Sequence, residues 1–318
     1  MTGKNRLWAT AAFAGVIAVA SVTVSNAYHQ QLLTIIGIHT LLALGLNMLM
    51  GYAGQISLGH AAFYGLGAYG TGILTTHYGC SPWAAFPVVL AAAGWLAYVI
   101  GRPTLKLSGY YLAMGTLGLG IIAHVIFREW DSMTGGASGM VGIPPLQVGG
   151  TVLSLGRSGM ILVWVTVLTA FFLGSRLVDS RIGRALRALG DSQGAAAACG
   201  IDTGRLKAVI FSFSAVLAAL AGFLYAHLVG FISPSSFDFL MSIRMVTMVV
   251  IGGMASIWGS LFGASVITML PEWLHIFSDY EMTVYGLVLM VVMIFLPRGL
   301  TRGMLDAVER VRRVRRKA

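Results

Sequence analysis

The segment RLVDSRIGRALRALGDSQGAAAACGIDTGRLK, residues 176–207, is the longest polar interruption of an otherwise apolar sequence. Three arginines recur in it at every third position and so share one helical face: Arg181, Arg184 and Arg187. An apolar stripe follows the other side of the same helix: Ile182, Ala185, Leu186 and Leu189. The pattern predicts a short helix that lies on a membrane surface with its arginines in water.

A second short helix is expected directly after the first. Asp191 or Ser192 can cap its start, and it continues through Ala195–Ala198. Gly200 suits the left-handed residue that often ends a helix. The apolar helix that follows has two candidate caps, Asp202 and Thr203. We therefore interpret residues 176–205 as a cytoplasmic loop of two short helices on the inner membrane face.

Two functions fit such a loop. It can be a basic loop that only fixes the orientation of the chain in the membrane. It can also be a docking surface for a soluble motor protein. The run AAAACGI, residues 195–201, favours docking, because small side chains let a helix lie deep in a partner's groove.

The composition is that of a membrane protein. Apolar residues make up 57% of the 318 residues and charged residues only 10%, whereas a soluble domain has about 25% charged residues. Cys80 and Cys199 are too few for a disulfide scaffold, and no Cys/His cluster has zinc spacing. The net charge of +10 comes with no nucleic-acid motif, so we expect it to face anionic lipid headgroups or a partner protein.

A membrane-spanning helix needs about 20 apolar residues. The sequence offers candidate spans at residues 7–24, 32–50, 58–76, 83–101, 110–127, 159–175, 206–229, 239–255, 259–276 and 282–296. These predict an all-α, polytopic bundle of about ten helices that forms a single transmembrane domain over residues 1–318.

The distribution of Lys and Arg predicts the orientation. With Lys4 and Arg6 inside, alternate threading puts nearly all basic residues on the inner side, and the exceptions are Arg128, Arg157 and Arg244. The positive-inside bias then places both termini in the cytoplasm. Residues 7–24 could instead belong to a cleaved signal peptide, but the run is long for a signal, and an uncleaved span is preferred.

The same threading assigns the polar segments. Residues 128–158 form the longest outer, periplasmic loop, and residues 299–318 form a basic cytoplasmic tail. His227 and Arg244 are expected near outer helix ends, where they can snorkel to the surface. Because the spans contain no series of buried acids that could relay protons, the energy source is expected outside this chain.

A second informative segment, residues 41–72, reads LLALGLNMLMGYAGQISLGHAAFYGLGAYGTG. Its glycines allow close helix packing, or a helix break whose free carbonyls face a cavity. Its polar side chains favour a place near the path of a polar substrate. The candidate pathway residues are Gly51, Gly54, Gln55, Ser57 and Gly59. Tight packing alone is the alternative, with His60 as an internally hydrogen-bonded residue. Residues 252–264, GGMASIWGSLFGA, form a similar glycine-interrupted segment in the second half.

Several segments in order carry a family resemblance: GYAGQISLGHAAF at 51–63, TGGASG at 134–139, GRALRA at 183–188, GFISP at 230–234, IGGMASIWG at 251–259 and PRGL at 297–300. On these segments the chain resembles the M-type permease subunit of bacterial branched-chain amino acid ABC importers. The resemblance covers nearly the whole chain after the first predicted span.

The resemblance implies partners. They are a second, related permease subunit, two cytoplasmic subunits that bind ATP, and a periplasmic substrate-binding protein. No cofactor is implied for this chain itself. Carried onto this sequence, the ATPase-coupling residues are Asp191, Ala195, Ala196 and Gly200. The chain departs from its relatives at Gln193 and Ala197, where they usually have acidic residues, and near Arg244.

The resulting hypothesis is a non-catalytic permease subunit of an ATP-driven importer, which moves branched-chain or similar small amino acids across the inner membrane by alternating access. A permease for urea or short-chain amides uses a similar chain and is the first alternative. A secondary carrier that works without an ATPase is the second. A membrane enzyme is least supported, because no nucleophile–base pair or metal-ligand spacing is present in the sequence.

Overall fold

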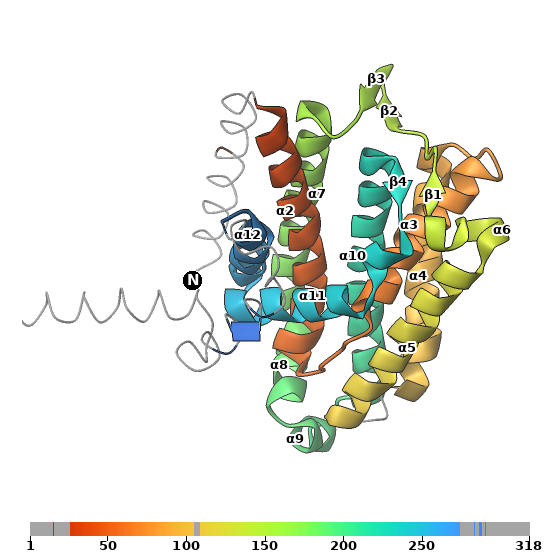
Figure 1. Ribbon diagram of the computed structural model, residues 1–318. Coiled ribbons are helices and arrows are strands. Elements are labelled where there is room, and N and C mark those ends of the chain that lie inside the picture. Colours follow the sequence, from red (N-terminus) through yellow and green to blue (C-terminus); the bar gives the residue numbers. More distant parts are fainter. Residues whose placement is uncertain are drawn as a thin grey trace, which may run out of the picture.

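The computed structural model describes residues 26–104 and 109–273, together with residues 15, 283, 286, 287 and 290. Of the predicted elements, the spans at 7–24 and 282–296 lie almost wholly outside these residues, and the basic tail at 299–318 lies entirely outside them. The described part is a bundle of long helices that run roughly side by side (Figure 1). Short helices cover one end of the bundle, and two small β-ladders cover the other.

Within the described residues, 5 helices are long and apolar enough to cross a membrane. They are α2 (Ala27–Asn47), which continues as the π-helical turn η1 (Met48–Tyr52), α4 (Pro82–Thr104), α5 (Tyr110–Glu129), α7 (Arg157–Asp179) and α10 (Thr203–Val229). Three apolar helices are shorter: α3 (His60–Thr76), α11 (Phe239–Gly252) and α12 (Ile257–Trp273). Each of the predicted spans between residues 32 and 276 therefore corresponds to a helix, and the all-α bundle is confirmed.

Helix α10 lies at the centre of the bundle and packs against α2, α3 and α4. Its contact with α3 is a backbone contact, because each helix places a glycine where they meet. A Cβ atom at Gly67 would collide with the backbone of Ala219, and one at Gly222 would collide with the backbone of Tyr64. Small residues at such crossings let membrane helices approach closely enough for dispersion contacts to hold them.

Helix α11 differs from the prediction. The apolar run at 239–255 was expected to span the membrane, but α11 has only 14 residues, about 21 Å of helix against a hydrocarbon core of about 30 Å. It runs across the long helices instead of alongside them (Figure 1). Asp238 caps its start by accepting a hydrogen bond from the Met241 N–H at 2.9 Å, and Gly253 ends it with φ of 111°.

From α2 to α10 the connecting loops alternate between the two ends of the bundle (Figure 1). One end carries α8 (Arg181–Asp191) and α9 (Gln193–Ala198). The opposite end carries α6 (Asp131–Thr134), η2 (Gly136–Ser138), β1 (Met140–Val141), β2 (Leu146–Val148), β3 (Thr151–Leu153), β4 (Phe231–Ile232) and η3 (Pro234–Phe237). We call these the α8–α9 end and the strand end.

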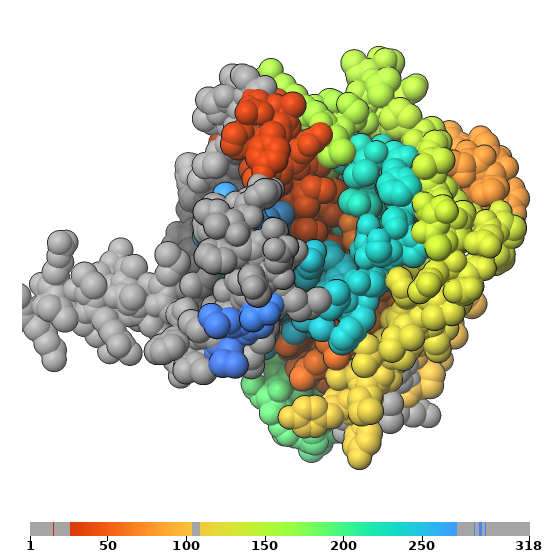
Figure 2. All heavy atoms as spheres, in the orientation of Figure 1, coloured from red at the N-terminus to blue at the C-terminus, as the bar shows by residue number. Residues whose placement is uncertain are grey.

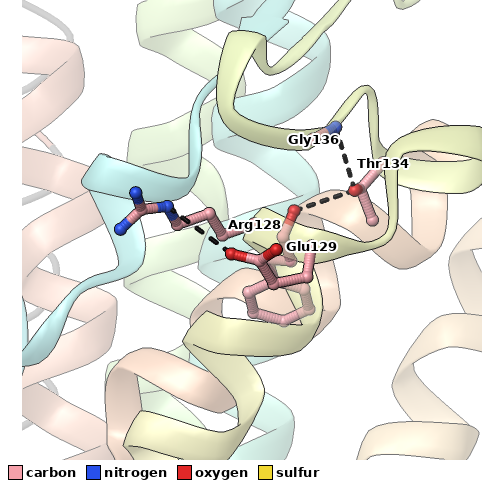
Figure 3. A network of polar contacts seen from close by, with 5 residues as sticks. Arg128, Glu129, Thr134 and Gly136 are labelled. Carbon is pink, nitrogen blue, oxygen red and sulfur yellow. Dashed lines mark hydrogen bonds and ion pairs between the residues drawn. The ribbon is translucent and has the colours of Figure 1, made fainter.

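At the strand end, two loops that are far apart in the sequence are joined. β1 pairs antiparallel with β4, with Met140 opposite Ile232, and β2 and β3 form a hairpin. Beneath them, Thr134 folds the loop back onto α5, since its hydroxyl donates to the Phe127 carbonyl at 2.8 Å and accepts from the Gly136 N–H at 3.3 Å (Figure 3). Residues 128–158, which the sequence predicts as an outer loop, therefore form an ordered cover at this end of the bundle.

Helix α5 lies on the surface of the molecule (Figure 2). Its exposed side chains are mostly apolar, among them Tyr110, Tyr111, Met114, Ile121 and Ile122. An apolar surface of this extent suits contact with lipid or with another membrane subunit.

The contact between α3 and α10 gives a test of the fold. Replacing Gly67 with valine should destabilise the protein by at least about 1–3 kcal/mol, the usual cost of overpacking a core, because the neighbour it meets is backbone and cannot rotate away. The matched control is Gly118→Val, since Gly118 is also helical but has no neighbour within 4 Å of its Cβ position. Thermal unfolding of the purified protein measures both, and equal midpoints would contradict the close crossing.

Candidate functional site

The two short helices at the α8–α9 end form as the sequence predicts. Ser180 caps α8 by accepting from the Gly183 N–H, and Ser192 caps α9 by accepting from the Ala195 N–H, each at 3.3 Å. Asp202 caps α10 by accepting from the Arg205 N–H at 3.0 Å. The alternatives left open by the sequence are thus decided in favour of Ser192 and Asp202.

The polarity of α8 is mostly as predicted. Its three arginines are exposed, and Leu186 and Leu189 are buried. Ile182 is the exception, because it is 45% exposed although the predicted apolar stripe included it. Gly183 takes the inward position instead, packed on the backbone at the end of α7, where no side chain fits.

The residues predicted to couple the chain to a motor all lie at this end. Asp191, Ala195 and Gly200 are exposed, and Gly200 has the left-handed φ of 80° expected of a helix stop. Ala196 is 1% exposed and faces its own chain. A partner can therefore reach three of the four residues directly, while Ala196 fixes how α9 rests on the bundle.

A buried cation also holds α9 in place. Lys207 is 1% exposed, and its ammonium group donates a hydrogen bond of 2.8 Å to the side-chain oxygen of Gln193 at the start of α9. In the sequence, Lys207 is only the last of several basic residues in the segment 176–207. Its role was missed because a charge count does not show which residues α10 buries.

The predicted glycine-rich break is present between η1 and α3. Residues 54–59 are not helical, so the chain turns there before α3 begins. Gly54, with φ of 65°, lies directly against the backbone of Gly190, the residue before Asp191. The candidate pathway segment and the candidate coupling segment therefore touch through two glycines.

Asn47 joins this break to the second glycine-rich segment. Its side-chain oxygen accepts from the Ala255 N–H at 2.9 Å, and its amide donates to the Ser256 carbonyl at 2.7 Å and to the Ser260 hydroxyl at 3.0 Å. Gly51 is also packed against the backbone of Ala255. Among the described residues, Ala255 is the non-glycine with a positive φ, 57°, a conformation that costs about 1–2 kcal/mol for an L-residue. The Asn47 bond offsets part of that cost.

The polar side chains of the break are bonded within the chain. Ser57 contacts the His60 Nδ1 at 2.9 Å, and the His60 Nε2 contacts the Ser214 hydroxyl of α10 at 2.6 Å. The Gln55 amide donates to the Ala53 carbonyl at 3.0 Å. His60 is thus an internally hydrogen-bonded residue, as the alternative interpretation held.

Gly59 completes the packing of the break, because it lies against the backbone of Thr116 in α5. The Thr116 hydroxyl also accepts from the Leu58 N–H at 3.0 Å. In this conformation the break is a packed joint between α2, α3, α5 and α10. We call residues 53–59 the joint.

His227 corrects one prediction. It was expected to snorkel from an outer helix end, but it is 1% exposed. Its Nε2 contacts the Thr71 hydroxyl at 2.8 Å and its Nδ1 contacts the Pro144 carbonyl at 2.7 Å. Both partners are far away in the sequence, so no local pattern could have shown them.

The charged residues of the strand end remain at the surface. The Arg128 Nε and the Glu129 Oε1 lie 3.8 Å apart, and the two side chains are 61% and 72% exposed (Figure 3). An ion pair this open adds little to stability. Among residues 26–104 and 109–273, no group of three or more His, Cys, Asp or Glu side chains is placed to hold a metal ion.

Comparison with known proteins places this geometry in a family. Residues 28–296 match the family described as branched-chain amino acid transport system / permease component. The chain is 31% identical to the high-affinity branched-chain amino acid transport system permease protein LivM of Escherichia coli, over 94% of this chain and 75% of that protein.

More distant relatives extend the comparison. The permease protein LivH of the same transport system type in Escherichia coli is 27% identical over 82% of this chain and 90% of its own length. The autoinducer 2 import system permease protein LsrC of Escherichia coli is 29% identical over 60% of this chain and 56% of that protein. No solved structure gives a significant match.

The hydrogen bonds of Asn47 give a test of the joint. Asn47→Leu keeps a side chain of similar size but leaves the Ala255 N–H and the Ser256 carbonyl without this partner. We expect a loss of about 1–3 kcal/mol in the free energy of unfolding, the usual cost of a buried polar group left unpaired. Gln31→Leu removes an amide from an exposed position of the same helix and should change little. Similar thermal unfolding of the two variants would show that Asn47 does not hold the joint.

Proposed function

This chain belongs to the family of branched-chain amino acid transport system permease components, and we propose that it moves branched-chain amino acids inward by alternating access. It is a multi-pass membrane permease subunit of an ABC importer. In the proposed complex it pairs with a second, related permease subunit. Two ATP-binding subunits and a substrate-binding protein complete the importer.

One observation carries the proposed mechanism: the exposed coupling segment is connected to the joint through backbone. α8 leads directly into α9, Gly190 of α8 touches Gly54 of the joint, and Asn47 at the end of α2 bonds to residues 255–260. A displacement of α8 and α9 by a docked ATPase would therefore shift α2, α3 and the start of α12 together. Packed elements of this kind switch between discrete arrangements and do not deform continuously.

The orientation follows from charge. The α8–α9 end carries the arginines of α8, with Arg205 and Lys207 at the start of α10, and the positive-inside bias assigns such an end to the cytoplasm. The ATP-binding subunits would dock there. The strand end then faces the periplasm, both termini lie in the cytoplasm, and the substrate-binding protein meets the ordered cover formed by residues 128–158.

ATP hydrolysis is assigned to the partner subunits, and we propose no catalytic residue or cofactor for this chain. The candidate pathway residues Gly51, Gly54, Gln55, Ser57 and Gly59 keep a positional role. Gly51 lies in η1 just before the joint and the other four lie in the joint itself, whose rearrangement would open the path.

Branched-chain amino acids are the favoured substrates, because LivM and LivH carry that description in their names. The similarity to LsrC, named for autoinducer 2 import, shows that related permeases serve other cargo. Short-chain amides and urea remain the alternative substrates.

Transport in vesicles tests the whole proposal. The chain, its partner permease and the ATP-binding subunits are reconstituted with ATP inside, and the binding protein is supplied outside with radiolabelled leucine or urea. Accumulation of leucine that requires both ATP and the ATP-binding subunits is the expected result. Accumulation driven by an ion gradient without those subunits would establish a secondary carrier instead, and accumulation of urea alone would reassign the substrate.

The docking surface can be tested separately. Ala195→Arg adds a long charged side chain to the exposed face of α9 without disturbing a buried contact, and it should reduce co-purification of the ATP-binding subunits at least about tenfold, since truncating or blocking a central contact typically costs 2 kcal/mol or more. Gly200→Arg is less informative, because φ of 80° would strain any side chain there. The control is Ala137→Arg, at an exposed position of η2 at the strand end. Full recovery of the ATP-binding subunits with Ala195→Arg would remove α9 from the interface.

A further inference from the structure

A polar cleft opens at the α8–α9 end, beside the coupling segment but distinct from its exposed alanines. Its volume is about 930 Å³. Its lining comes from the end of α4, the start of α9 and the start of α10: Tyr98, Arg102, Pro103, Gln193, Asp202, Gly204, Arg205 and Lys207. Three of these residues are cationic and one is anionic, so the lining is strongly basic.

The anionic residue is already engaged. The Asp202 carboxylate accepts the Arg205 N–H as the cap of α10, so it serves the first turn of the helix. Lys207 forms the inner wall, where it is 1% exposed and donates to Gln193. The N-terminus of the 27-residue α10 also points its positive dipole end at this region. These features together favour an anion in the cleft.

Arg102 is held in position at the edge of the cleft. Its guanidinium lies over the ring of Tyr98, 4.8 Å from the centroid, and donates to the Tyr98 hydroxyl at 2.8 Å. An arginine that stacks in this way keeps further N–H groups for a second acceptor. A phosphate group, with several oxygens, matches such a fork of donors.

The face of α4 that leads to Arg102 is exposed and apolar. Val88, Trp95 and Val99 are 55%, 67% and 45% exposed and recur at helical spacing. Arg102 follows at the end of the same stripe, where an apolar surface meets a cation. That is the level at which lipid headgroups lie against a membrane protein.

We propose that this cleft binds the phosphate headgroup of an anionic phospholipid. Basic pockets between helices at the cytoplasmic side suit anionic headgroups, which are held there at high local concentration by the bilayer itself. The lipid would bridge α4 to the starts of α9 and α10, and so would fix the element that carries the coupling segment. The membrane composition would then influence how firmly α9 is seated.

The test measures lipid binding to the purified, assembled importer by native mass spectrometry. The probes are short-chain phosphatidylglycerol, phosphatidylcholine of the same chain length, and inorganic phosphate. We expect phosphatidylglycerol to bind in preference to phosphatidylcholine. The double substitution Arg102→Gln and Arg205→Gln should weaken it about 30-fold, since each basic side chain near an anionic headgroup contributes about a fivefold factor.

Two further variants keep the test independent of folding. Arg102→Lys with Arg205→Lys retains the charge and should retain most of the binding. Arg181→Gln with Arg184→Gln removes the same charge from the exposed face of α8, outside the cleft, and should leave lipid binding unchanged.

Four outcomes would overturn the proposal. They are equal binding of the two lipids, equal loss of binding in the α8 control, and displacement of the lipid by millimolar inorganic phosphate. The fourth is loss of the ATP-binding subunits from the Arg102→Gln, Arg205→Gln variant with unchanged lipid binding, which would assign the cleft to a protein carboxylate.

Discussion

The contact between Gly54 and Gly190 is the constraint on which the functional arrangement depends. It brings the backbone of the joint directly against the backbone of α8, and a side chain on either residue would separate the two segments. Because no flexible side chain lies between them, a displacement of one segment would move the other directly, with no side-chain rotamer change to absorb it. The surface that a partner can reach is thereby mechanically part of the helix bundle.

Buried polar side chains then hold the segments around this contact. Asn47 ties α2 to the start of α12, and His60 ties the joint to α10 through Ser214. Lys207 seats α9 through Gln193. Where such bonds lie away from water, they specify how the helices pack. A different packing would leave the polar groups without a hydrogen-bond partner. The glycines let the helix backbones approach closely, and the hydrogen bonds determine which of the possible close packings forms.

Local rules predicted the short helices α8 and α9 well. Ser192, Gly200 and Asp202 act through neighbours a few residues away, so their roles could be inferred from spacing alone. Hydropathy located the described spans for a similar reason, because it depends on short windows. Hydropathy could not give the direction of α11, since a segment is equally apolar whether it runs parallel to the long helices or across them. Nor could it place His227, whose partner Pro144 is 83 residues away.

The departure at Gln193 gains a physical meaning from the structure. A carboxylate at that position would form a charge pair with the buried Lys207. This chain uses a neutral amide at 2.8 Å instead. A charge–dipole bond is weaker than a charge–charge bond in a low-dielectric site, so an amide at this position seats α9 less firmly than a carboxylate would. Lys207 also lies in the wall of the basic cleft, so one ammonium group both seats α9 and contributes to the positive lining of the cleft. The position of α9 and the binding of an anion in the cleft therefore both depend on the Lys207 ammonium group.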